Sequence, residues 1–127
     1  MTYVDIVTAL AVLQYLVFGL KVGAARERYG VRAPAVTGHE VFERRFRVQQ
    51  NTLEQLIAFL PGLYLFSRHL DPRWGAAIGV LYLIGRELYS AAYVRDPAKR
   101  GPGFGLSFLA VAALVLGGLV GALHALR

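Results

Sequence analysis

Four long apolar segments alternate along the chain with short stretches rich in arginine, glycine and proline. A helix that crosses a bilayer needs roughly 20 residues, and each segment reaches that length, the second and third only together with polar residues at one end. The pattern therefore predicts an all-α integral membrane protein: one domain, residues 1–127, folded as a four-transmembrane-helix bundle. The expected spans are approximately Val4–Ala25, Val41–Ser67, Trp74–Tyr93 and Phe104–Leu126.

The second segment begins with charge where a membrane helix should have none, in FERRFRVQQNTLEQ, residues 42–55. In a helix, Arg47, Asn51 and Glu54 share one face. The apolar run that follows ends at Phe66, so a span of roughly 20 residues must take part of this stripe into the bilayer. Ionisable groups are costly there and normally face a polar cavity. We interpret the stripe as the floor of a binding site for a charged ligand.

A second interpretation of the same stretch is open at this point. It could be an amphipathic segment at the level of the lipid headgroups, with Arg44 and Arg45 extending to lipid phosphates.

The third segment carries a polar stripe of its own, formed by Arg86, Tyr89 and Tyr93. Tyrosines at the end of a span are also typical of an interfacial aromatic belt. Most Lys and Arg residues lie in the first and third loops, which the positive-inside rule places in the cytoplasm. Both stripes then lie at cytoplasmic ends. The predicted pocket comprises Arg47, Asn51, Glu54, Arg86, Tyr89 and Tyr93, bordered by Arg26 and Arg100.

Composition narrows the class of protein. Hydrophobic residues make up 56% of the chain and charged residues 17%, whereas soluble domains have roughly 25% charged residues. The basic residues behind the net charge of +6 cluster between the apolar runs, which favours membrane topology over nucleic-acid binding.

The absence of cysteine excludes disulfides and cysteine nucleophiles. His69 and His124 have no third ligand, so we expect no metal site. The N-terminal stretch MTYVDIV lacks the basic residues with which a signal peptide begins. We therefore expect the first helix to be retained and not cleaved as a signal.

The predicted pocket suits a small ligand that carries several anionic groups. Arginines bind carboxylates through paired donors, and Glu54 suits an ammonium group. Tyrosine hydroxyls and an asparagine amide can orient a peptide. An arginine beside a thiol lowers the pKa of that thiol and makes it nucleophilic near neutral pH. If thiol chemistry takes place here, the thiol must come from the substrate, because the chain has no cysteine. Lipid beside the pocket would give an apolar electrophile a way in.

The sequence resembles the MAPEG family, the membrane-associated proteins of eicosanoid and glutathione metabolism. The resemblance rests on FERRFRVQQNTLEQ, RELYSAAYVRDPAKR, the AARERYGV loop and four spans in the same order. It implies a homotrimer with each pocket between neighbouring subunits, and glutathione as co-substrate. Arg100 matches the family arginine that holds the thiolate. The resemblance assigns glutathione binding to Arg26, Arg47, Asn51, Glu54, Arg86, Tyr89 and Tyr93.

The resemblance implies a membrane glutathione transferase that conjugates glutathione to hydrophobic electrophiles, a detoxification chemistry, with glutathione peroxidase activity toward lipid hydroperoxides as a second activity. A bacterial inner membrane is the expected location. Compared with leukotriene C synthase, this chain has Glu27 in place of an arginine, Gln55 in place of a tyrosine, and its proline at Pro61 instead of at Ile57. These differences argue against a leukotriene-specific function.

Two other functions are compatible with the sequence. One is a non-catalytic, lipid-binding member of the same fold. The other is a small four-span transporter with Glu54 as a proton or cation site, because intramembrane glutamates mark such pathways.

Overall fold

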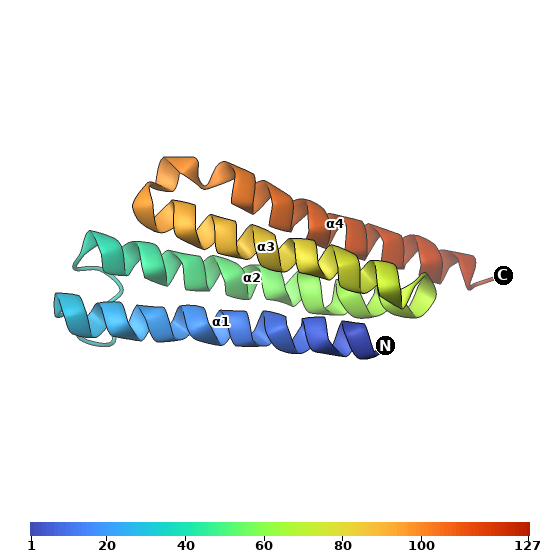
Figure 1. The fold of residues 1–127 in the computed structure, drawn as a ribbon, viewed down its shortest axis with the longest axis horizontal. Helices are drawn as coiled ribbons and strands as arrows, with labels where there is room; N and C mark the ends of the chain where they lie inside the picture. The colour runs from blue at the N-terminus through green and yellow to red at the C-terminus, as the bar shows by residue number, and fades with distance from the viewer.

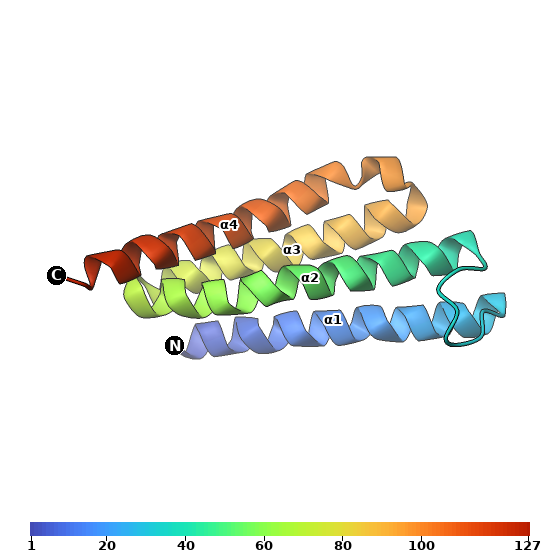
Figure 2. The same cartoon turned by 180° about the vertical axis from the view of Figure 1, so that it is seen from behind.

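Four long helices form an antiparallel bundle in the computed structural model, which describes residues 1–127. Both termini lie at one end, and the first and third connections lie at the other (Figure 1). Helices α1 and α4 lie on opposite sides of the α2–α3 pair (Figures 1 and 2). The predicted all-helical fold is confirmed. The elements are α1 (Thr2–Tyr29), α2 (Glu40–His69), α3 (Pro72–Arg95), the short 3-10 helix η1 (Pro97–Lys99) and α4 (Gly101–His124).

The third connection is shorter than the sequence indicated. We expected the fourth span to begin near Phe104, but α4 begins at Gly101. Pro102 is compatible with this start because the first turn of a helix has no internal partner for its N–H groups. Only a short turn therefore separates α3 from α4, and this turn carries Arg100. At its other end α4 stops at His124, two residues before the expected Leu126.

The end of α1 is joined to the start of α2 by side-chain contacts across the first loop. Gly30 ends α1 with φ 67° and ψ 30°, a left-handed conformation that glycine adopts without strain. His39 caps α2 by accepting a hydrogen bond from the Val41 backbone N–H at 3.1 Å. The ring of His39 also stacks on Tyr29, with 3.8 Å between centroids. These contacts fix the angle at which α2 begins its polar stripe.

The core contains apolar side chains from all four helices, including Val7, Phe59, Tyr82 and Leu114. The rings of Phe59 and Tyr82 stack at 3.8 Å. Large apolar side chains also cover the outside of the bundle, and Leu109 is 67% exposed. Helices α1 and α4 are each long and apolar enough to cross a membrane. An outer surface of this kind fits contact with lipid tails better than contact with water.

Replacing Gly103 with alanine should destabilise the bundle, because α3 and α4 touch at this point. A Cβ there would lie 2.3 Å from the backbone nitrogen of Tyr89, so the helices would have to separate. We expect a loss of about 1–3 kcal/mol, the usual cost of overpacking. Gly105 is the control, because a Cβ there meets nothing within 4 Å and alanine favours helix. Thermal unfolding in detergent, followed by circular dichroism, compares the two variants; equal midpoints would contradict this packing.

Candidate functional site

A cavity of about 380 Å³ opens between α2, α3 and the start of α4, at the end of the bundle where the first and third connections lie. Two of its residues are cationic, two are tyrosines, and one is an amide. The cavity is lined by Arg47, Asn51, Tyr89, Tyr93, Arg100 and Phe104. Five of these residues belong to the predicted pocket, and Phe104 was not predicted. The two polar stripes and the third connection therefore do meet in one chain.

Each helix presents its residues one turn apart, which aims them at the same space. On α3 the rings of Tyr89 and Tyr93 lie 5.5 Å apart. Phe104 of α4 packs 6.2 Å from the Tyr89 ring and forms an apolar wall. The guanidinium of Arg100 donates to the Pro97 carbonyl at 2.8 Å, so η1 holds this arginine at the mouth.

Arg86 lies beneath the cavity and does not line it. Its side chain is fully buried. Nη1 donates to Asn51 Oδ1 at 2.6 Å and to Thr52 Oγ1 at 3.3 Å. Nη2 donates to Ser107 Oγ at 3.0 Å, and the guanidinium lies 4.3 Å from the centroid of the Tyr89 ring. Arg86 thus joins α2, α3 and α4 under the site.

This network fixes the orientation of one cavity residue. Because Asn51 Oδ1 accepts from Arg86, the Nδ2 group is the part of the amide that remains available to donate to a ligand. The sequence placed Arg86 in the ligand-binding stripe, on the same helix face as Tyr89. In the structure its guanidinium contacts Asn51 and the Tyr89 ring and does not line the cavity.

Arg26 and Glu54 do not reach this cavity within a single chain. Arg26 donates to the Ala35 carbonyl at 2.7 Å, and its guanidinium lies 4.6 Å from the centroid of the Phe42 ring. Glu54 is exposed on α2, on the side turned away from the buried face of that helix. Ile57, one turn further, is 71% exposed. The cavity formed by a single chain is therefore lined by neither of these two predicted residues.

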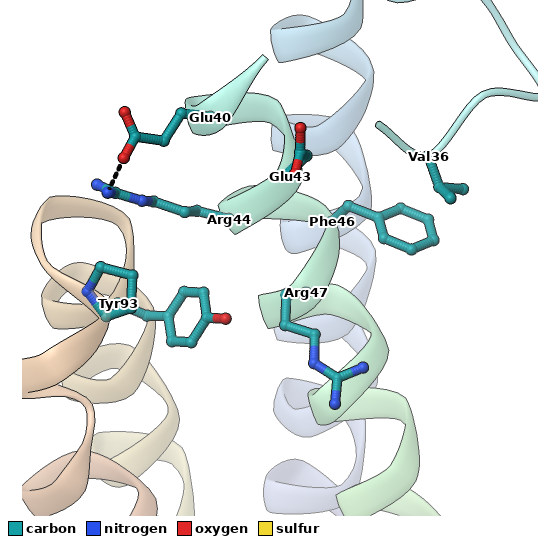
Figure 3. A pocket seen from close by; sticks show the side chains of 8 residues that line it. Val36, Glu40, Glu43, Arg44, Phe46, Arg47 and Tyr93 are labelled. Carbon is teal, nitrogen blue, oxygen red and sulfur yellow. Dashed lines mark hydrogen bonds and ion pairs between the residues drawn. The ribbon is translucent and has the colours of Figure 1, made fainter. Parts of the chain in front are cut away.

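A second cavity, of about 600 Å³, adjoins the first and shares Arg47 and Tyr93 with it (Figure 3). Figure 3 shows the Tyr93 hydroxyl pointing from α3 toward α2, where Arg47 lies. The second cavity extends to the first loop, where Val36 forms part of its wall. The full lining is Val36, Glu40, Glu43, Arg44, Phe46, Arg47, Tyr93 and Pro97.

Arg44 joins the start of α2 to the end of α3 in the wall of this second cavity. It forms an ion pair with Glu40. Its Nη1 also donates to the carbonyls of Val94 and Arg95, at 3.0 and 3.1 Å. The sequence interpretation that turned Arg44 toward lipid phosphates is therefore wrong for this residue. The four-residue spacing from Glu40 was the available signal, since it places the two side chains on one helix face.

The electrostatics of the 380 Å³ cavity favour an anion. Arg47 and Arg100 line it, and no carboxylate does. Arg86 adds a third cation beneath the floor, and its hydrogen-bond partners are all neutral. Guanidinium groups bind carboxylates and stabilise thiolates, while hydroxyl and amide groups align a peptide. The arrangement suits a small anionic peptide better than an apolar ligand alone.

Comparison with known proteins decides the family. The MAPEG family model matches residues 4–120. The chain belongs to the MAPEG family. The resemblance drawn from the two polar stripes is thereby confirmed, and proteins of this family are membrane-bound. This membrane association agrees with helices α1 and α4, each of which is long and apolar enough to cross a membrane.

Several MAPEG relatives align along nearly the whole chain. An uncharacterized protein of Synechocystis sp. is 50% identical over 122 residues, covering 96% of this chain and 89% of the relative. Human microsomal glutathione S-transferase 2 is 39% identical over 115 residues, covering 91% of this chain and 78% of the relative. The cattle microsomal glutathione S-transferase 2 is 35% identical over 117 residues, with coverage of 92% and 80%. The similarity therefore includes both polar stripes and the third connection.

Proposed function

We propose that this protein is a membrane glutathione transferase. It binds glutathione in the 380 Å³ cavity, ionises the thiol beside Arg100, and adds the sulfur to a hydrophobic electrophile that arrives from the bilayer. The observation that carries the proposal is the meeting of Arg47, Asn51, Tyr89 and Arg100 in one cavity that no carboxylate lines. Two of the relatives carry the name microsomal glutathione S-transferase 2, which supports the same activity.

In this mechanism each residue has one role. Arg47 binds a carboxylate of glutathione through paired donors. The Nδ2 group of Asn51, with its orientation fixed by Arg86, donates to a peptide carbonyl. Arg100 faces the sulfur and stabilises the thiolate, and the adjoining N-terminus of α4 adds partial positive charge.

The chemical step is nucleophilic attack by the thiolate. The thiol proton leaves to solvent through the open mouth of the cavity. The sulfur lone pair forms a carbon–sulfur bond, and the electron pair of the electrophile moves to a leaving group or along a conjugated double bond. Phe104 presents an apolar edge of the cavity on the side of α4, the helix with the most apolar span. This edge is where an electrophile dissolved in lipid would reach the sulfur.

All four helices cross the membrane in this proposal, although α2 and α3 carry the polar stripes. The first and third connections face the cytoplasm, because the basic residues gather there. Glutathione is a solute of the cytoplasm, so the site opens where its substrate is found. A bacterial inner membrane remains the proposed location.

The active assembly is proposed to be a homotrimer with the site shared between neighbouring subunits. Glu54 and Ile57 form an exposed stripe along α2 that continues the line of Arg47. A neighbouring copy packed on this stripe would cover it and bring a second set of side chains to the cavity. Arg26, which lies on a different flank of the same chain, is the cation that such a neighbour would supply. Glu54 would then be enclosed with the ligand and available to its ammonium group.

Glutathione binding tests the proposed ligand directly. Arg47→Gln should weaken glutathione affinity about 10–100-fold, because a hydrogen bond to a charged group is lost. The fold should be unaffected because Arg47 is exposed. Arg68→Gln is the matched control: it removes an exposed arginine of the same helix that lies outside the cavity. Equilibrium dialysis of labelled glutathione against detergent-solubilised protein measures both. Equal affinity in the two variants would remove the basis for this binding mode.

Subunit complementation tests the shared site. Arg26→Ala and Arg47→Ala chains should each be weakly active alone. When the two are co-expressed in equal amounts, random assembly around a ring leaves roughly a quarter of the interfaces with both arginines intact. Activity should then rise well above the mean of the separate variants. If both arginines served a site within one chain, mixed oligomers would hold no intact site, and activity would stay at that mean.

A further inference from the structure

A third cavity, of about 230 Å³, lies between α1 and α2, and it shares no residue with the two cavities described above. Its lining residues come from the last part of α1 and the start of α2. Figure 1 shows these two helix ends side by side, joined by the first loop. Three of its lining residues are cationic and none is acidic. The cavity is lined by Lys21, Ala24, Ala25, Arg28, Tyr29, Val41 and Arg45.

The three cations of this cavity have no anionic partner in the protein. The ion pairs of the chain are Glu40–Arg44 and Asp71–Arg73, both elsewhere. Lys21 lies 5.8 Å from the centroid of the Phe18 ring, and Arg28 lies 5.5 Å from that of Tyr29. On the facing helix α3, Glu87 accepts from the Gln14 amide at 3.2 Å. Gln14 is seven residues before Lys21, about 10 Å along the helix, so this carboxylate does not neutralise the cavity.

An exposed apolar stripe leads along α1 to these cations. Leu10 and Val17 are 46% and 44% exposed, and Leu13 beside them is 54% exposed. In a helix, positions 10, 17, 21 and 28 fall on one face, so Lys21 and Arg28 continue the line of Leu10 and Val17. Because α1 is long and apolar enough to cross a membrane, the stripe lies at acyl-chain depth and the cations lie at headgroup depth.

We propose that this cavity binds the phosphate of an anionic phospholipid, with an acyl chain lying along the stripe from Val17 to Leu10. Lys21, Arg28 and Arg45 surround the phosphate, and the Tyr29 hydroxyl can donate to a further oxygen. A free phosphate would use the cations but not the stripe, which is why the lipid is the better occupant. The proposal concerns a flank that the glutathione site does not use, so it stands independently of the proposed activity.

Lipid selectivity tests this site in the intact protein. Protein in a neutral detergent is titrated with dioleoylphosphatidylglycerol or dioleoylphosphatidylcholine, and native mass spectrometry measures the bound lipid. The test variant is Lys21→Gln, Arg28→Gln, Arg45→Gln. The control removes three exposed arginines that lie outside the cavity: Arg32→Gln, Arg68→Gln, Arg127→Gln.

The wild type and the control should bind the anionic lipid at least about tenfold more tightly than the zwitterionic one, and the test variant should lose this preference. A thermal unfolding transition in detergent close to that of the wild type, followed by circular dichroism, shows that the test variant is folded. If the triple variant does not fold, Arg28→Gln alone, at an exposed position, should lower the preference about threefold.

Three results would overturn the proposal. The first is a wild type without any preference for the anionic lipid. The second is an equal loss in the test and control variants, which would show that only overall charge matters. The third is displacement of the anionic lipid by an equal concentration of inorganic phosphate, which would make the cavity a site for a soluble anion and not for a lipid.

Discussion

Replacing Arg100 with alanine should lower kcat/KM for conjugation at least about tenfold at pH 7, with a much smaller change in glutathione affinity. A thiol with an ordinary pKa near 8.5 is only about 3% ionised at pH 7. The enzyme must therefore supply positive charge beside the sulfur, and Arg100 is the cation at the mouth of the cavity. The loss of rate is smaller than the loss of ionisation, because a thiolate of lower pKa is intrinsically less nucleophilic.

The pH dependence separates a thiolate role from a merely structural one. At about pH 9.5 an unassisted thiol is roughly 90% ionised, so the deficit of Arg100→Ala should shrink to a few-fold. Stopped-flow conjugation to a chromogenic aryl halide across this range measures the effect. Lys99→Ala is the matched control: it removes the neighbouring exposed cation, which lies outside the cavity. A deficit that stays constant with pH would show that Arg100 does not act on ionisation.

Replacing Arg86 with methionine should destabilise the bundle by about 2–5 kcal/mol, since several buried polar groups lose their partner at once. Asn51, Thr52 and Ser107 all accept from this guanidinium. Glutathione affinity should fall as well, because the Asn51 amide is no longer held. Thermal unfolding and equilibrium dialysis measure the two effects on one preparation. Arg95→Met, an exposed arginine of the same helix, is the control.

A compensated variant distinguishes positioning from stability. Arg86→Met combined with Thr52→Val and Ser107→Ala removes the partners together with the donor, which can restore much of the stability. Asn51 stays unsupported in this variant, so glutathione affinity should remain low while the unfolding midpoint recovers. Recovery of both quantities together would contradict a positioning role for Arg86.

The sequence alone was sufficient to predict the helical architecture and to predict that the polar stripes of the second and third helices meet. Helical spacing put Arg47 with Asn51 and Tyr89 with Tyr93, and charge placed both pairs at one end of the bundle. The structure brings these four residues into one cavity. The position of Arg100 came from the family resemblance, because a residue in a connection has no periodicity to place it.

The role of Arg86 could not be predicted from one helix face. Periodicity gives the direction of a side chain but not its depth, and depth depends on the neighbouring helix. The fourth apolar segment has no charged residue to mark it as part of a site, yet its Ser107 accepts from Arg86, and its Gly103 touches Tyr89. Both contacts follow from the packing of α3 against α4.

Arg26 and Glu54 show a second kind of limit. The stripe on α2 predicted that Glu54 would join Arg47 and Asn51, but the stripe extends past the edge of the cavity onto the exposed side of the helix. Within a single chain, no other helix covers the exposed side of α2 that carries Glu54. Whether these residues join the site therefore depends on assembly, which the complementation experiment addresses.

The most direct test of the central claim is the ultraviolet absorbance of the thiolate during a titration of detergent-purified protein with glutathione at neutral pH. The account predicts a saturable thiolate signal in the wild type, and no such signal in Arg100→Ala protein that still binds glutathione. A folded wild type that binds glutathione without any thiolate signal, or an equal signal in Arg100→Ala, would contradict the proposal that this cavity activates the glutathione thiol.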